Sequence, residues 1–226
     1  MDNQYLEKLF EKFQIKPNNY SIYLEAFTHS SYKNDNHLDY SYERLEFLGD
    51  AIIQKIVTEH LYKKHLEMNE GDMSKARNII VQSGTLVRAA KELLFENIIL
   101  VGNSLSKNDN KITDNILEDS FEAFIGAVFL DQNEKKCYQI LKRTIIHYFE
   151  INALNEFKDW KSLFQELMQK NGKTDIRYAT TKYENKEYTV ELWNNNTKYS
   201  IAKDENIKRA QIKAAKEAYN KCIRIK

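Results

Sequence analysis

The chain has 226 residues, of which 42% are hydrophobic and 30% charged, with a formal net charge of +1. This length allows one large domain or two smaller ones, and the composition excludes a disordered chain. The longest uncharged apolar run, at 123–130, is far too short to span a bilayer, and the N-terminus lacks the apolar core of a signal peptide. We therefore expect a soluble, cytoplasmic protein with two reduced cysteines.

The charges are distributed unevenly along the chain. Residues 1–151 carry 18 Lys and Arg against 23 Asp and Glu, whereas residues 152–226 carry 16 against 10. A metal-binding part followed by a polyanion-binding part would have this distribution, although it also arises by chance. The hydrophobic pattern changes near residues 151–158, so we expect two domains, at 1–151 and 158–226.

Helical periodicity dominates the first domain. The pattern predicts four longer helices, at residues 41–65, 74–94, 114–130 and 134–150. The segment 69–72 contains Gly and turn-forming polar residues and is interpreted as a break, which makes Ser74 the expected cap of the second helix. A polar loop is expected at 102–114. The predicted fold class of this domain is all-helical.

The second domain combines helices with short strands. An amphipathic helix is predicted at 160–169, period-2 alternation predicts a strand at 188–193, and a turn at 194–196 leads to a strand at 198–202. An Ala-rich helix with many Lys and Arg follows at 206–222. A further strand is expected before residue 180. The predicted order is then α-β-β-β-α, which makes a small α+β domain. The whole chain is therefore predicted to be mainly α.

Three acids stand on one face of the helix predicted at 41–65. Glu43, Glu46 and Asp50 follow the spacing i, i+3 and i+7, which stacks side chains along one helical face. Adjacent carboxylates repel one another unless a cation lies among them, and Mg²⁺ prefers such oxygen ligands. An exposed acidic helix face, which is common, has the same spacing, so the pattern alone leaves both interpretations open.

A second acidic pair precedes an apolar stretch. Asp119 and Glu122 are one helical turn apart and are followed by the apolar residues 123–126, where an unpartnered carboxylate is costly. Two acid pairs on two core helices could converge on shared metal, an arrangement that serves phosphodiester hydrolysis. A di-iron bundle would need Glu-x-x-His motifs, which the sequence lacks. Glu118 points to another face and is interpreted as solvated.

Four segments of the sequence stand out as motifs: FTHSSY (27–32), YERLEFLGDA (42–51), NEGDMSKARNIIV (69–81) and ILEDSFEAFIGAVFLD (116–131). In this order they resemble blocks of the ribonuclease III family, whose two signature blocks are similar to 42–51 and 116–131. The resemblance implies a homodimeric endonuclease that hydrolyses double-stranded RNA with Mg²⁺, for which Mn²⁺ is a possible substitute. It further implies 5′-phosphate and 3′-hydroxyl ends with short 3′ overhangs, and roles in processing rRNA precursors and mRNA.

The resemblance also implies roles for individual residues. The metal ligands would be Glu46, Asp50, Asp119 and Glu122, and of these Asp50 and Glu122 would be catalytic. Glu43 and Glu70 would help to bind substrate, and Phe47 and Leu48 match positions that pack across the subunit interface. His29, in FTHSSY, is expected to make a structural hydrogen bond rather than bind metal. The other histidines share no spacing and are interpreted as surface or packing residues: His37, His60, His65 and His147.

Residues 158–224 resemble a double-stranded RNA-binding domain. The resemblance places Ser162, Gln165 and Glu166 in a minor groove and Lys208, Arg209 and Lys213 at phosphates. The sequence departs from the usual domain at two places, and both lower the RNA affinity that we expect. The segment 180–188 is short and lacks the usual Gly-Pro-x-His element, and the approach to the last helix, 202–206, contains two acids.

Two alternatives to a general double-strand nuclease remain. One is a non-catalytic RNA binder that kept the fold, and the retention of all four acids argues against it. The other is a compact relative that acts only on one ribosomal RNA, and the presence of the second domain argues against the smallest of these enzymes.

Overall fold

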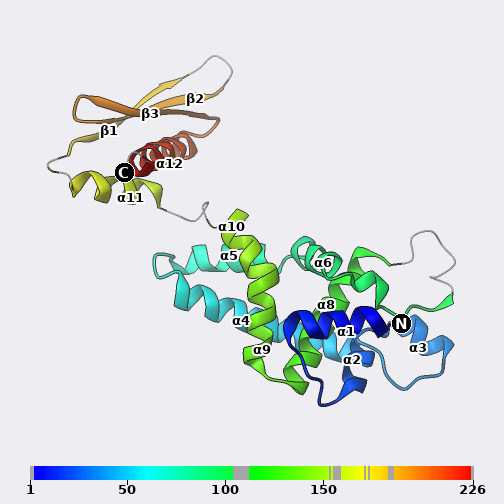
Figure 1. Cartoon of the computed structure of the whole chain (residues 1–226). Coiled ribbons are helices and arrows are strands. Elements are labelled where there is room, and N and C mark those ends of the chain that lie inside the picture. Colours follow the sequence, from blue (N-terminus) through cyan, green and yellow to red (C-terminus); the bar gives the residue numbers. More distant parts are fainter. Residues whose placement is uncertain are drawn as a thin grey trace. The chain divides into compact units, whose positions relative to one another are not determined.

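The structure is a computed structural model that describes residues 3–103, 112–152, 154, 159–170, 172, 174–182 and 186–224. Parts of the predicted loop at 102–114 and of the segment 180–188 lie outside these ranges. The chain divides into two compact units, Met1–Phe157 and Lys158–Lys226. Figure 1 shows that the first is helical and that the second combines a sheet with helices, which confirms the predicted fold class.

The first unit is built from helices around a central one, α8. Its elements are α1 (Asn3–Phe13), α2 (Tyr20–Ala26), α3 (Ser30–Asp35), α4 (Glu43–Lys64), α5 (Glu70–Val81), α6 (Ser83–Glu92), η1 (Phe95–Asn97), α8 (Asp114–Asp131), α9 (Glu134–Leu141), η2 (Lys142–Ile146) and α10 (His147–Asn152). The π-helical turn η2 joins α9 to α10 without a break. None of the helices in the described ranges is both long and apolar enough to cross a membrane.

The prediction of a single helix at 74–94 is wrong. Two helices, α5 and α6, occupy this region, and Gln82 between them has extended backbone angles. Ser74 does not cap the first of them, because α5 begins at Glu70 and the Asn69 side chain accepts a hydrogen bond from the Asp72 N–H at 2.9 Å. The segment 69–72, predicted to be a break, therefore consists of the cap of α5 and the first residues of that helix.

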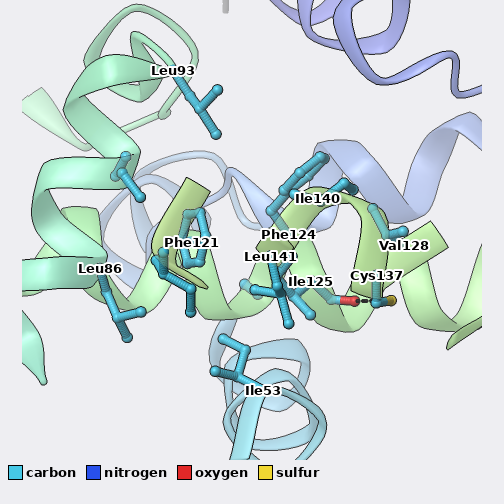
Figure 2. Close-up of a cluster of buried hydrophobic side chains, with 14 of the residues drawn as sticks. Ile53, Leu86, Leu93, Phe121, Phe124, Ile125, Val128, Cys137, Ile140 and Leu141 are labelled. Atoms are coloured by element: carbon cyan, nitrogen blue, oxygen red, sulfur yellow. Dashed lines mark hydrogen bonds between the residues drawn. The ribbon is translucent and has the colours of Figure 1, made fainter. Parts of the chain in front are cut away.

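The core of the first unit surrounds α8, whose residues are apolar on nearly every side. Figure 2 shows Phe121, Phe124, Ile125 and Val128 of this helix among side chains of α4, α6 and α9. The Cys137 thiol donates to the Ile125 carbonyl oxygen at 3.6 Å. Because α8 is packed on several sides, the acids along its one polar edge are held in fixed positions.

The second unit is a three-stranded antiparallel sheet with two helices packed against it. It consists of α11 (Trp160–Gln169), β1 (Ile176–Lys182), β2 (Tyr188–Asn194), β3 (Thr197–Asp204) and α12 (Ile207–Arg224), in the sheet order β1-β2-β3. Val190 and Leu192 alternate into a core that also contains Phe164 of α11. The alanines of α12 let this helix lie close to the sheet, and the Ser200 hydroxyl donates to the Ala214 carbonyl oxygen at 2.7 Å.

Candidate active site

The backbones of α4 and α8 touch where the two helices cross. A Cβ atom on Gly49 would lie 1.8 Å from the carbonyl oxygen of Glu122, and one on Gly126 would lie 2.3 Å from that of Leu45. No side chain fits at either position, so only glycine allows this approach. Because Glu46 and Asp50 flank Gly49 along α4, the contact brings them to the edge of α8 that carries Asp119 and Glu122.

The four acids interact electrostatically as one cluster. Burial raises the pKa of Glu122 to about 8, and the charges of Asp50, Glu118, Glu46 and Asp119 contribute to this rise. Burial also raises the pKa of Glu46, to which Asp119 contributes, and burial raises the pKa of Asp119 itself. The structure therefore brings together the residues of both predicted acid clusters, although they lie some 70 residues apart in the sequence.

Tyr42 holds Asp119 in place. Its hydroxyl donates to Asp119 Oδ2 at 3.2 Å, and its own N–H donates to the Thr28 carbonyl oxygen at 2.9 Å. The ring of His29 lies edge-on to that of Tyr42, with centroids 5.6 Å apart, and His29 Nδ1 accepts from the Ser31 N–H at 3.0 Å to cap α3. His29 thus has the structural hydrogen bond predicted for it. Sequence reasoning missed Tyr42, although it is the first residue of YERLEFLGDA.

The donor set suits a hard divalent cation. Across the described ranges, none of the four acids has a Lys, Arg or His partner within 4.0 Å. In the same ranges, no three of the four acids have carboxylate oxygens that all lie within 4.8 Å of one another. Mg²⁺ keeps several waters and needs only one or two direct carboxylates, so this wider spacing fits it.

The structure places the supporting acids differently from one another. Glu43, in the first turn of α4, accepts from the Ser41 hydroxyl at 3.0 Å and contributes to the raised pKa of Glu46, so it borders the cluster. Glu70 begins α5, where it accepts from the Ser74 hydroxyl at 3.0 Å and lines a groove beside the second half of α4. Glu70 therefore lies on a different part of the surface from the acid cluster.

Glu118 faces the start of α6, on a different face from the other acids as predicted, but it still acts on them electrostatically. Its side chain is half-buried, accepts a hydrogen bond from the Ser83 hydroxyl and acts electrostatically on both Glu46 and Glu122. Because Glu118 is one residue away from Asp119 along the helix, its side chain points toward the start of α6. It is still close enough to interact electrostatically with Glu46 and Glu122.

Phe47 lies between the acids on α4 and is 83% exposed, whereas its neighbour Leu48 is half-buried. The Phe47 ring therefore adds an exposed apolar group to the surface beside the acids.

The predicted RNA-binding residues of the second unit are exposed, but two already have partners. Ser162, Gln165 and Glu166 lie along the outer face of α11, and the Ser162 hydroxyl donates to Asp159 Oδ2 at 2.7 Å. In α12, Lys208 and Arg209 lie in the first turn. Lys213 Nζ forms an ion pair with Asp204 Oδ2 at 2.8 Å.

Comparisons with known proteins agree with this architecture. Residues 19–149 match the Ribonuclease-III-like family, and residues 160–222 match the double-stranded RNA binding motif. The chain belongs to the ribonuclease III family. "Ribonuclease 3" of Ureaplasma parvum is 39% identical over 225 residues, covering 96% of this chain and 95% of that protein.

Two further relatives from this family differ in extent. "Ribonuclease 3" of Mycoplasmoides gallisepticum is 47% identical over 96% of this chain, which spans only 33% of that longer protein. The nuclease domain of ribonuclease III from Campylobacter jejuni is 34% identical with a TM-score of 0.59, over 65% of this chain and 99% of that domain. A region of that domain is involved in dimer formation and is structurally flexible.

Proposed function

We propose that this member of the ribonuclease III family is an endonuclease that hydrolyses double-stranded RNA in a divalent-metal-dependent reaction. The observation that carries the proposal is the convergence of Glu46, Asp50, Asp119 and Glu122 where α4 crosses α8. The match of the second unit to the double-stranded RNA binding motif supports the substrate class.

The four acids would hold Mg²⁺, or Mn²⁺ in its place, which when bound supplies a polarised water and stabilises charge on the phosphate. Asp50 and Glu122 are the proposed catalytic residues. The pKa of Glu122, raised to about 8 by burial and the neighbouring carboxylates, reflects a concentration of negative charge that a bound divalent cation would offset. Tyr42 orients Asp119 by donating to one carboxylate oxygen, which leaves the other oxygen available as a ligand.

The proposal includes a homodimer formed through the surface around Phe47 and Leu48. The 83% exposure of Phe47 supports it, because a second copy would cover this ring. Two sites across one duplex would cut both strands at offset positions, leaving 5′-phosphate and 3′-hydroxyl ends with short 3′ overhangs. We further propose rRNA precursors and mRNA as substrates, and the cytoplasm as the place of action.

Substrate contacts are proposed on both units. Glu43 borders the acid cluster, and Glu70 lines a separate groove between α5 and the second half of α4; we propose that each helps to orient the duplex. In the second unit the exposed polar face of α11 suits a minor groove and the start of α12 suits phosphates. The residues proposed there are Ser162, Gln165, Glu166, Lys208, Arg209 and Lys213.

The decisive experiment incubates the full chain with long duplex RNA in Mg²⁺ or in EDTA and sequences the product ends. We expect cleavage only with the metal, and 5′-phosphate ends with short 3′ overhangs. Binding without cleavage in Mg²⁺ and in Mn²⁺ would instead support the non-catalytic RNA binder. Blunt ends would refute the offset arrangement of two sites.

A further inference from the structure

A second cluster of metal-ligating side chains lies away from the acids. His60 is on the last turns of α4, His65 follows the end of that helix, and Glu150 is on α10. A ring nitrogen of each histidine and a carboxylate oxygen of Glu150 lie within 4.8 Å of one another, the one such group in the parts of the chain that the structure describes. Both histidines are buried, as packing residues are, but the fold also brings them together, which their spacing does not predict.

Each ring has one nitrogen close to a polar group and one nitrogen with no hydrogen-bond partner among the described residues. His60 Nδ1 lies 3.2 Å from the Tyr138 hydroxyl, and His65 Nδ1 lies 3.4 Å from Glu67 Oε1. The Nε2 atom of each ring is buried and has no hydrogen-bond partner among the described residues. Glu150 Oε1 lies 3.3 Å from His60 Nε2, within ion-pair distance but outside hydrogen-bond geometry.

This pattern matches that of histidines that bind a metal ion. A ligating histidine usually bonds through its second ring nitrogen to a carboxylate or another polar group, which fixes the tautomer and aims the free nitrogen at the ion. Tyr138 and Glu67 occupy that position for His60 and His65. Without an ion, the buried His65 Nε2 has no hydrogen-bond partner among the described residues, and His60 Nε2 has only its 3.3 Å contact with Glu150.

Protonation is a poor alternative means of satisfying these nitrogens. The two ring centroids are 5.7 Å apart, so two imidazolium charges would repel each other. Burial lowers the pKa of His60; Glu150 opposes this shift, and His65 and Lys142 add to it. A neutral imidazole is the form that binds metal.

We propose that His60, His65 and Glu150 bind a divalent transition-metal ion of the Zn²⁺ type. Two imidazole nitrogens and one carboxylate are ligands that suit Zn²⁺, with a fourth position open to water. Tetrahedral ligands at about 2.0–2.1 Å from Zn²⁺ lie about 3.4 Å from one another, so side-chain adjustments of about 1 Å close the site. His60 and Tyr138 also line a surface pocket, to which neither His65 nor Glu150 contributes.

The site would join the C-terminal end of α4 to the last helix of the first unit. Ten residues separate His60 from Asp50 on α4, about 15 Å along the helix axis, so the ion is separate from the one at the acid cluster. Its effect is structural, and the proposal does not rest on the nuclease activity.

The test measures Zn²⁺ and Co²⁺ binding to the metal-stripped full chain, with Mg²⁺ in excess to occupy the acid cluster. We expect one Zn²⁺ per chain in competition with a chromogenic chelator, and the visible absorption bands of tetrahedral Co²⁺. His65→Gln and Glu150→Gln should each weaken Zn²⁺ binding at least about 10-fold and abolish these bands.

Two controls separate this site from others. His147→Gln removes an exposed histidine on the same helix as Glu150 and should leave binding unchanged, as should Glu122→Gln in the acid cluster. Zn²⁺ should raise the melting temperature of the wild type and both controls, but not that of the two site variants. Glu150 is 31% exposed, so Glu150→Gln should fold even if His65→Gln does not. Equal Zn²⁺ affinity in Glu150→Gln and wild type would overturn the proposal.

Discussion

The acid cluster and the basic surface of the second unit would act on the same polyanion, but they are built in opposite ways. At the crossing of α4 and α8, two backbones in contact fix the carboxylates, and no side chain acts as a spacer. On α12 the cations are exposed, and Lys213 is paired with Asp204. Metal-assisted chemistry depends on positions held to within fractions of an ångström, whereas attraction to phosphates depends on net charge and tolerates mobile side chains.

The largest effect is expected from Glu122→Gln. It keeps the shape of the side chain but removes a charged ligand, so we expect cleavage of duplex RNA to fall roughly 1,000-fold or more, which corresponds to several kcal/mol. RNA binding should change less than about twofold. Single-turnover cleavage and filter binding measure the two quantities. Near wild-type cleavage in Mg²⁺ would remove Glu122 from the site.

Gly49→Ala tests the backbone contact itself. The added methyl group would lie 1.8 Å from the Glu122 carbonyl oxygen, so the helices must separate. We expect a loss of about 1–3 kcal/mol in the free energy of unfolding and roughly 100-fold in cleavage rate. Gly84→Ala is the matched control, because nothing lies within 4 Å of its Cβ and it should gain up to about 1 kcal/mol. Equal behaviour of the two variants would mean that the crossing tolerates a spacer.

Deleting residues 153–226 removes the basic unit and leaves the acids in place. We expect the affinity for duplex RNA to fall at least about 10-fold near 0.2 M salt, with a smaller loss at low salt. Cleavage at saturating RNA in low salt should persist. Titration of labelled duplex at several salt concentrations measures this, and an unchanged affinity would show that the first unit alone binds RNA.

The raised pKa of Glu122 predicts a pH dependence of stability without metal. In the unfolded chain this carboxyl titrates near 4.5, and in the fold its pKa is about 8, so charging it opposes folding as the pH rises between these values. In EDTA we expect the wild type to lose several degrees of melting temperature relative to Glu122→Gln between pH 5 and pH 8, with no further divergence above it. Mg²⁺ should remove the difference. A constant difference across this range would show that Glu122 is solvated.

Asp204→Asn should produce the smallest effect, in the opposite direction. The amide keeps the oxygen that accepts from the Asn206 N–H at 2.9 Å but releases Lys213 from its ion pair. We expect a two- to threefold gain in duplex RNA affinity, about 0.5 kcal/mol, and a steeper salt dependence. Lys213→Ala in the Asp204→Asn background should cancel the gain; if it does not, the effect has another origin.

Sequence periodicity predicted the acid pairs, because carboxylates one turn apart on two largely apolar helices repel one another unless a cation lies between them. It failed where contacts depend on the tertiary fold. His65 lies beyond the end of α4 and Glu150 is 85 residues further on, so no helical spacing relates them. The predicted helix 74–94 overlooked Ser83-Gly84, a dipeptide that often marks a turn and that directly follows the break at Gln82. Tyr42 reaches Asp119 across 77 positions, which a single sequence does not reveal.

The π-helical turn η2 has a consequence for everything that follows it. A π turn holds one residue more than an α-helical turn, which rotates the rest of the helix by about 100°. In the observed register Phe149 is buried in the core and Glu150 points toward His60. Without the extra residue, different side chains would occupy both places. The extra residue in η2 therefore determines which side chains of α10 face the C-terminal end of α4.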